Sequence, residues 1–248
     1  MSGRLNVYPT ADALAQGAAN QIALLLSESI HSRGRALIAL SGGGTPRGVY
    51  TLLASDSFQS RVRWKSVHVF WGDERCVSPE HPDSNFKMAN ETLLKHITIP
   101  SSHVHRVMGE LEPEHAVRAY EEELRRTFRL GHDALPKFDL ILLGLGDDGH
   151  TASLFPGTPS LRERQKLVTG VFVEKWKSYR VTLTYPTINN AAHILFLVSG
   201  RSKSAILADV LQSNTETYPA QLVRPVDGDL QWLVDQDAAS QAEPVHHP

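Results

Sequence analysis

The sequence predicts an α/β protein in which a mostly parallel central sheet carries helices on both faces. Short, almost wholly apolar segments, such as those at 36–40 and 67–71, are typical of strands buried on both faces of a parallel sheet. Between such segments, apolar residues recur at helical spacing, and parallel strands require helical crossovers of this kind. With 248 residues, 41% of them hydrophobic, the chain is long enough to bury a core around the sheet.

The first predicted element is a helix that follows Thr10 and ends at Arg33. Thr10 is a favourable N-cap and Gly34 a favourable residue for the left-handed turn that ends a helix. The apolar residues that recur at helical spacing in this segment are Leu14, Ala18, Ile22, Leu25 and Leu26.

Strands and helices then alternate along the rest of the chain. We expect strands at 36–40, 67–71, 138–144, 180–185 and 194–199, and helices near 46–55, 84–95, 113–130 and 202–212. No internal repeat, low-complexity tract or charge block marks a domain boundary. The sequence therefore predicts a single Rossmann-like domain over residues 1–248.

Composition and charge exclude several classes of partner. The chain has 25 basic and 27 acidic residues, so no overall positive field attracts nucleic acid or lipid headgroups. The apolar stretches at 22–26 and 140–146 are too short to span a membrane. The single cysteine, Cys76, cannot form an intramolecular disulfide, and we interpret it as a packing residue. The first ten residues lack a secretion signal, so we expect a cytoplasmic protein, and no exposed amphipathic face argues against a monomer.

The site should lie where the parallel strands end, because open α/β sheets bind ligands beyond the carboxyl ends of their strands. The four most unusual segments of this chain follow predicted strands. They are SGGGTPRG at 41–48, GDERC at 72–76, GLGDDGHTASLFPG at 144–157 and SGRSK at 199–203.

The first of these segments is predicted to bind an anion. It contains Ser41, Gly42, Gly43, Gly44 and Thr45, and it joins a strand to a helix whose first N–H groups are unpaired. The alternative is a flexible turn with a proline at the first helical position. A GxxxxGK[ST] loop is absent, so a nucleoside triphosphate is not implied.

The segment at 144–149 formally matches GxGxxG, and Glu174 lies at a suitable distance for a ribose partner. Pro156 and Pro159 break the helix that such a fingerprint requires, and Asp147 and Asp148 place negative charge where a pyrophosphate would dock. We therefore disfavour a nicotinamide or flavin site.

Asp148 and His150 share one tight turn in the same segment. Imidazole is well suited to general-base catalysis near neutral pH, and a neighbouring carboxylate can orient it. The alternative is a structural histidine, but the position among glycines at a strand end favours a catalytic role for His150, with Asp148 as its partner.

Cationic side chains follow or open other predicted strands. Arg75 stands beside Asp73 and Glu74, which could hold it toward the crevice or form a structural ion pair with it. Arg180 and Lys203 could converge on one anion, the first as a planar fork and the second as a point charge.

Two further chemistries are disfavoured. Asp147, Asp148 and His150 form a cluster, as do His103 and His105, but neither HExxH nor a pair of CxxC motifs occurs, so we expect no metal. A serine hydrolase is disfavoured because GxSxG is absent.

Taken together, several segments resemble those of the 6-phosphogluconolactonases, in the same order and from about Ala36 to Ala239. They are SGGGTPRGVY, FWGDERCV followed by SNF at 84–86, GLGDDGHTASLFPG, RVTLTYPTIN, AAHILFLVSGRSK, YPAQLVRP and WLVDQDAA. The glucosamine-6-phosphate deaminases share the glycine loop and the D-G-H turn, but they carry a glutamate where this chain has Phe155 before the proline. They also carry D-E-Y in place of Asp73-Glu74-Arg75.

The resemblance implies a glucosamine-6-phosphate deaminase-like fold and a carboxylic ester hydrolase that converts 6-phospho-D-glucono-1,5-lactone to 6-phosphogluconate in the pentose phosphate pathway. It implies no cofactor, and a sugar phosphate lactone as the small-molecule partner. It also implies that His150, Asp148 and Arg75 are catalytic. The substrate and its phosphate would then contact Ser41, Gly42, Gly43, Gly44, Thr45, Asp73, Arg180 and Lys203. A deaminase and a non-catalytic sugar phosphate sensor are the two alternatives.

Overall fold

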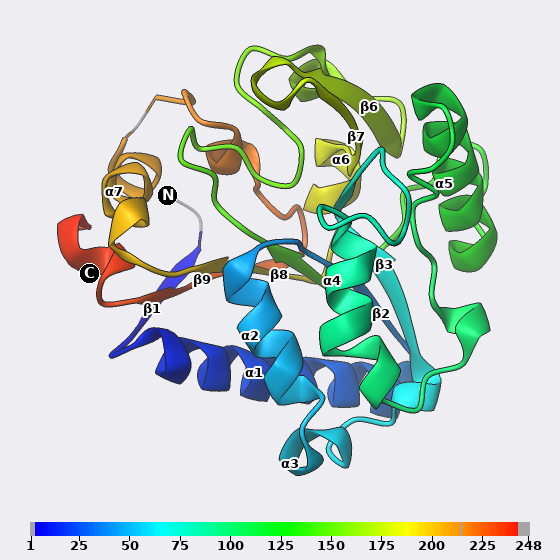
Figure 1. Ribbon diagram of the computed structural model, residues 1–248, viewed down its shortest axis with the longest axis horizontal. Coiled ribbons are helices and arrows are strands. Elements are labelled where there is room, and N and C mark those ends of the chain that lie inside the picture. The colour runs from blue at the N-terminus through cyan, green and yellow to red at the C-terminus, as the bar shows by residue number, and fades with distance from the viewer. Residues whose placement is uncertain (1–2, 214, 243–248) are drawn as a thin grey trace.

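The structure is a computed structural model that describes residues 3–213 and 215–242 (Figure 1). Its centre is a six-stranded sheet with the strand order β1-β9-β8-β5-β2-β3, in which all neighbours are parallel. The strands are β1 (Arg4–Tyr8), β2 (Ala36–Leu40), β3 (Val67–Trp71), β5 (Leu140–Leu143), β8 (His193–Val198) and β9 (Asp229–Asp235). The predicted α/β class and mostly parallel sheet are confirmed.

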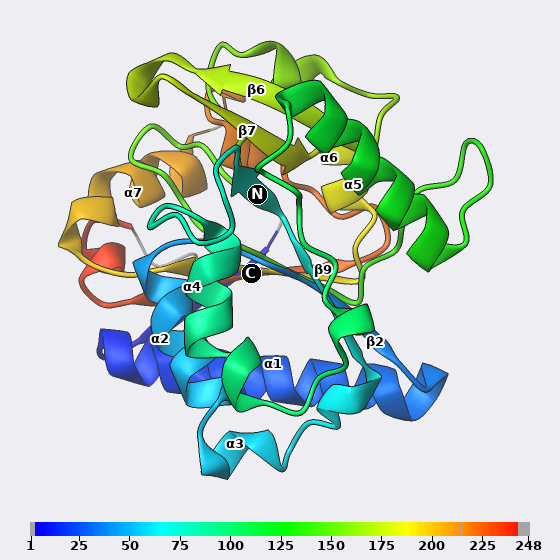
Figure 2. The ribbon, with the colours of Figure 1, turned by 45° about the vertical axis from the view of Figure 1, so that its right-hand side comes forward.

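The long helix α1 (Ala11–Arg33) has the ends that the sequence predicts. The Thr10 hydroxyl accepts a hydrogen bond from the Ala13 N–H, and Gly34 has the left-handed φ of 76° that ends the helix. Figures 1 and 2 show α1 running beneath the central sheet, where Leu14, Ile22 and Leu26 are fully buried.

The remaining helices are close to their predicted positions. They are α2 (Gly44–Leu53), α3 (Asp56–Gln59), α4 (Asn85–Thr92), α5 (Pro113–Phe128), α6 (Tyr185–Asn189) and α7 (Ser204–Gln212). Of these, α3 and α6 are short and were not expected. Within 3–213 and 215–242, no helix is long and apolar enough to cross a membrane. The final segment EPVHHP lies outside the described residues.

A second, three-stranded antiparallel sheet corrects one prediction. It has the order β4-β7-β6 and consists of β4 (Asp73–Arg75), β7 (Ser178–Leu183) and β6 (Val168–Val173). We expected a strand at 180–185 in the main sheet, but that strand lies in this small sheet. A short apolar strand has the same pattern in either sheet, and its partners are set by distant parts of the chain. The strands β1, β4, β6 and β9 were not predicted.

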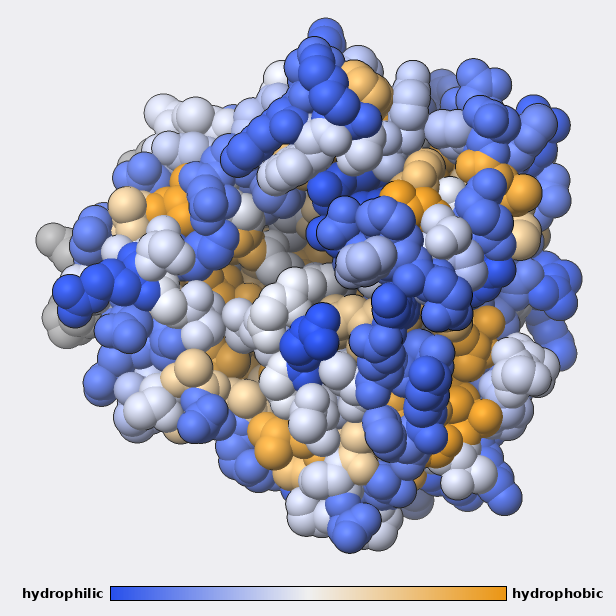
Figure 3. Space-filling model, viewed as in Figure 1, coloured by the Kyte–Doolittle hydropathy of each residue, from blue (hydrophilic) through white to orange (hydrophobic). Residues whose placement is uncertain are grey.

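The small sheet lies above the carboxyl ends of the parallel strands, together with α5 and α6 (Figures 1 and 2). Gly72 links the two sheets, because its N–H donates to the Leu40 carbonyl at the end of β2 while its carbonyl accepts from the Leu183 N–H of β7. The loops that follow β2, β5 and β8 therefore face the small sheet across a gap. Figure 3 shows this face of the molecule hollowed near its middle, with hydrophilic residues around the opening.

Candidate active site

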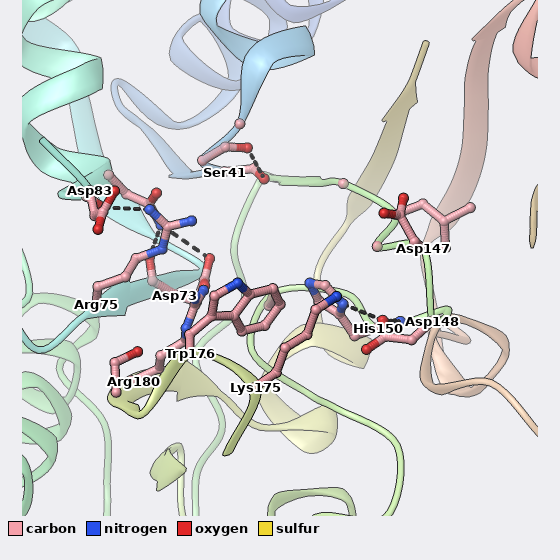
Figure 4. Close-up of a pocket in the computed structure, with 18 of the residues that line it drawn as sticks. Ser41, Asp73, Arg75, Asp83, Asp147, Asp148, His150, Lys175, Trp176 and Arg180 are labelled. Carbon is pink, nitrogen blue, oxygen red and sulfur yellow. Dashed lines mark hydrogen bonds and ion pairs between the residues drawn. The ribbon is translucent and has the colours of Figure 1, made fainter. Parts of the chain in front are cut away.

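A cavity of about 520 Å³ lies between the two sheets, and most of the predicted site residues line it (Figure 4). Those that line it are Ser41, Gly42, Gly43, Asp73, Arg75, Asp148, His150, Arg180 and Lys203. Gly44 and Thr45 are not among the lining residues, because they form the first turn of α2 behind the loop. The strand ends that the sequence singles out therefore meet in one place.

The glycine loop approaches the cavity closely because it has no side chains there. Gly43 is the N-cap of α2, with a φ of 105° that favours glycine. A Cβ on Gly42 would lie 2.0 Å from Asn85 Oδ1, so any other residue at this position would displace the Asn85 amide. The amide groups at the start of α2 thus lie beside the cavity, in a position suited to an anion.

His150 and Asp148 form a hydrogen-bonded pair on the loop after β5 (Figure 4). The His150 Nδ1 atom lies 2.5 Å from Asp148 Oδ1, and the same oxygen accepts the His150 backbone N–H at 3.1 Å. An ionised carboxylate only accepts, so Nδ1 carries the proton and the Nε2 lone pair is left free. The imidazole side chain is 20% exposed, at the edge of the cavity.

Burial sets the protonation state of this pair. It lowers the pKa of His150 below its ordinary value, although the Asp148 carboxylate acts in the opposite direction. Burial is the largest single influence on Asp148 and acts to raise its pKa, but the hydrogen bonds and the charge of His150 act together in the opposite direction, and the pKa is lowered. At neutral pH the pair is therefore a neutral imidazole beside a carboxylate, which is the form that can accept a proton.

Two glycines make room for this turn. A Cβ on Gly146 would lie 1.9 Å from His150 Nδ1, so the imidazole occupies the space that a side chain would need. Gly149 has a φ of 74°, and a Cβ there would lie 2.5 Å from Tyr218 Cδ1. The Gly146 N–H also donates to the His150 carbonyl at 2.8 Å, which closes the turn.

Arg75 and Arg180 are paired directly across β4 and β7. Burial lowers the pKa of Arg180, and the nearby positive charge of Arg75 lowers it further. Each guanidinium has a buried Nε atom that has no hydrogen-bond partner among residues 3–213 and 215–242. The Arg75 Nη1 atom, in contrast, donates to the Asp83 carbonyl. Two adjacent cations with unsatisfied donors favour an anionic ligand.

The buried Glu74 fixes the part of the cavity wall that carries Arg75. One of its carboxylate oxygens accepts the backbone N–H groups of Arg75 and Asn85 at 2.8 Å, and the other accepts that of Phe86 at 2.7 Å. Burial raises the pKa of Glu74 in spite of these bonds. Glu74 therefore ties β4 to the first turn of α4 and acts as a structural partner of the site.

Asp73 and Asn85 line the cavity beside the two arginines. Asp73 Oδ2 accepts the Ser153 hydroxyl at 2.6 Å, and Asn85 Nδ2 donates to the Asp73 carbonyl at 2.9 Å. Sequence reasoning did not single out Asn85 as a site residue. The SNF segment at 84–86 was the signal that could have found it.

Lys203 reaches the cavity from the turn after β8 and forms an ion pair with Asp147. The hydrogen bond from Lys203 lowers the pKa of Asp147. This turn is fixed by the buried Asp235, which accepts the Gly200 N–H at 3.0 Å. From the sequence, Asp147 was named as negative charge that disfavours a pyrophosphate and as part of a possible metal cluster, and it was not assigned to the substrate site. Within residues 3–213 and 215–242, no group of three or more His, Cys, Asp or Glu side chains could hold a metal ion.

Lys175 and Trp176 also line the cavity, and sequence reasoning missed both. They lie in the turn between β6 and β7 (Figure 4). No sequence signal could have found them, since two lysines around a tryptophan in a turn resemble any solvated loop.

Comparisons with known proteins agree on one family. The family model described as "Glucosamine-6-phosphate isomerases/6-phosphogluconolactonase" matches residues 9–232. The chain is 40% identical to a 6-phosphogluconolactonase of Synechocystis over 98% of this chain and 100% of that protein. It is also 40% identical to one of Nostoc over 97% of this chain and 99% of that protein.

Solved structures show the same likeness. A 6-phosphogluconolactonase from Trypanosoma brucei has a TM-score of 0.85 at 28% identity, and the match covers 96% of this chain and 98% of that one. A monomeric glucosamine-6-phosphate deaminase has a TM-score of 0.80 at 25% identity, and the match covers 96% of this chain and 99% of that one.

Proposed function

Because this chain belongs to the glucosamine-6-phosphate isomerase/6-phosphogluconolactonase family, we propose that it hydrolyses 6-phospho-D-glucono-1,5-lactone to 6-phosphogluconate in the oxidative pentose phosphate pathway. The observation that carries the proposal is the His150–Asp148 pair, which faces the same cavity as the guanidinium groups of Arg75 and Arg180. A base and an anion site in one cavity are what hydrolysis of a phosphorylated lactone requires. No organic cofactor takes part in this reaction.

The phosphate of the substrate binds to Gly43, Arg180 and Lys203. The start of α2 offers backbone N–H groups and the positive end of a helix dipole. Arg180 offers a guanidinium group at the cavity wall, and Lys203 is a cation there that can exchange its contact with Asp147 for one with phosphate. This anchoring places the lactone carbonyl beside His150.

His150 then acts as a general base. Its Nε2 atom takes a proton from water while the water oxygen forms a bond to C1 of the lactone. The tetrahedral intermediate collapses by breaking the bond between C1 and the ring oxygen, and the proton on Nε2 passes to that oxygen. The resulting carboxylic acid ionises to the gluconate. Asp148 keeps the imidazole oriented and stabilises its positive charge during the step.

Arg75 either stabilises the negative charge that develops on the carbonyl oxygen or binds a hydroxyl group of the substrate. Its guanidinium lies at the cavity wall, and its Nε has no partner within the described ranges. Lactones hydrolyse spontaneously, so a positioned base and a preorganised cation are sufficient without a covalent nucleophile.

The main alternative is a glucosamine-6-phosphate deaminase of the same family. The deaminases carry a glutamate at the position of Phe155, and here this buried side chain packs on the His150 ring, with 4.1 Å between the ring centroids. An apolar ring at this place cannot relay the proton that ring opening and amine release require. A coupled assay for ammonia from glucosamine 6-phosphate tests this alternative directly.

The deciding experiment is hydrolysis of freshly generated lactone by the purified protein, corrected for the spontaneous rate. We expect His150→Ala to lower kcat by roughly 10²–10⁴-fold. His132→Ala is the matched control, because His132 also pairs with a neighbouring aspartate, at 2.8 Å, but is 98% exposed and does not line the cavity. Undiminished turnover by His150→Ala would remove His150 as the base. Binding of 6-phosphogluconate without any turnover by the wild type would instead indicate a sensor.

We also propose that the enzyme is a cytoplasmic monomer without a nucleic acid partner. The net charge of −2 supports the absence of a nucleic acid partner, because it gives the protein no general attraction to polyanions. Light scattering of the purified protein measures the mass, and a dimer would contradict the proposal.

A further inference from the structure

We propose that the Trp176 indole is the surface on which the closed sugar ring stacks, so that this residue distinguishes the ring-closed lactone from its open-chain product. This inference rests on the function proposed above and adds a specificity-determining residue to it. It is carried by the position of the indole in the cavity, by the contacts that hold it, and by the shape of the two sugars.

Trp176 stands at the tip of the β6–β7 hairpin, inside the cavity. It ends a short helical turn (Glu174–Trp176), and Lys177, with a φ of 47°, returns the chain into β7. Trp176 is 43% exposed, and Figure 4 shows its side chain between His150 on one side and the pair Arg75 and Arg180 on the other. A ligand that spans from the arginines to the base therefore lies against the indole.

The indole is held in place by its neighbours. The buried Phe155 ring meets it edge to face, with 5.5 Å between centroids, and the His150 ring meets it in the same way at 6.2 Å. The Arg180 guanidinium lies 4.8 Å from the indole centroid. The exposed Lys175 also contacts this ring, at 4.9 Å, but its flexible side chain can move to the ligand.

A half-exposed aromatic ring in a polar cavity suits the shape of a sugar. A closed six-membered ring presents a compact face of C–H groups with hydroxyl groups at its rim, and such a face packs on an aromatic plane while the rim forms hydrogen bonds. Hydrolysis breaks the bond between C1 and the ring oxygen, and the product becomes a flexible chain without that face. Contact with Trp176 therefore favours the substrate over the product and promotes product release.

The first test compares binding of two stable ligands by calorimetry. Glucose 6-phosphate keeps the closed ring, whereas glucitol 6-phosphate carries the same phosphate on an open chain, with one more hydroxyl group, at C5. We expect wild-type protein to bind the closed ring roughly tenfold more tightly, which is the scale of one aromatic contact. The ratio of the two affinities, closed ring over open chain, should approach one in Trp176→Ala. It should be intermediate in Trp176→Phe.

Phe172→Ala is the matched control. Phe172 is 41% exposed on the same hairpin and packs on Tyr179, but it does not line the cavity, so the ratio should remain at the wild-type value. An unchanged ratio in Trp176→Ala, or equal binding of both ligands by wild type, would overturn the proposal.

The second test uses fluorescence of the unaltered protein, so it does not depend on the folding of a variant. The other three tryptophans, Trp64, Trp71 and Trp232, are at most 4% exposed. Glucose 6-phosphate should therefore change the emission of Trp176 and shield it from acrylamide, and Trp176→Phe should abolish the response. A ligand that binds without changing the emission would contradict stacking.

Lactone kinetics distinguish a failure of this proposal from a failure of the proposed function. Trp176→Ala should raise KM roughly tenfold while kcat changes by less than about threefold. A wild-type protein that prefers the closed ring but hydrolyses no lactone would refute the function and leave the stacking. Turnover without a ring preference would refute the stacking alone.

Discussion

Gly146→Ala should damage the reaction although it replaces none of the residues proposed to carry it. In the structure, the added methyl carbon would lie 1.9 Å from His150 Nδ1 and 2.1 Å from Cε1. Since Cβ contacts under 3.0 Å essentially never occur, the imidazole or the turn must move by roughly 1 Å. The 2.5 Å contact between His150 and Asp148 cannot survive such a shift unchanged.

The expected loss of rate follows from the displacement of the His150 imidazole. A misplacement of about 1 Å costs a reaction on the order of 10²-fold in rate, which corresponds to about 2.7 kcal/mol of transition-state stabilisation. We therefore expect kcat for the phosphorylated lactone to fall at least about a hundredfold. The crowding should also lower the free energy of unfolding by about 1–3 kcal/mol.

The assay is lactone hydrolysis by the variant, with circular dichroism and Tm to establish that it is folded. Gly48→Ala is the control, because Gly48 lies in α2 and a Cβ there meets no atom of the described residues within 4 Å. A folded Gly146→Ala enzyme with kcat within about threefold of the wild type would refute the reasoning, since the base would then not depend on this geometry.

Four further results are expected. With unphosphorylated gluconolactone, so that no substrate phosphate titrates, kcat/KM should fall on acidification with a midpoint below the ordinary histidine pKa of 6.5, because burial lowers the pKa of His150 and only its neutral form is the base. Asp148→Asn should move this midpoint lower still, since Asp148 acts to raise the pKa of His150; a rise would be inconsistent. Arg180→Gln and Lys203→Gln should each raise KM for the phosphorylated lactone much more than for gluconolactone, and equal effects on both would remove them from the phosphate pocket. Cys76→Ser should leave kcat within about twofold, because burial raises the pKa of this thiol to about 11 and the proposed chemistry uses no thiolate; an inactive variant would show that the site is misread.

Local features of the sequence determined much of the fold. The ends of α1 were predictable because Thr10 and Gly34 cap it through contacts within a few residues. The strands β2 and β3 were predictable because their apolar runs are bounded by polar or glycine residues. The meeting of the strand-end segments at one cavity was predictable for a topological reason, since parallel strands all end at one edge of their sheet.

The tertiary structure alone decided which side chains line the cavity opposite the loops of the main sheet. Strand β7 pairs with β4 in a separate sheet, and this pairing sets Arg75 beside Arg180. The β6–β7 hairpin then brings Trp176 over the cavity, and Glu74 brings Asn85 into it. The pairing of β4 with β7 joins segments that lie far apart in the chain, and no local periodicity encodes which strand finds which partner.

The sequence by itself thus determined the parallel α/β scaffold and the glycine-rich segments that surround His150 at a strand end, because caps, turns and apolar runs act over a few residues. The three-dimensional packing decided which distant side chains share the cavity with that histidine. Charge and aromatic contacts act through space, so the paired guanidinium groups and the indole opposite the base exist only once both sheets are in place.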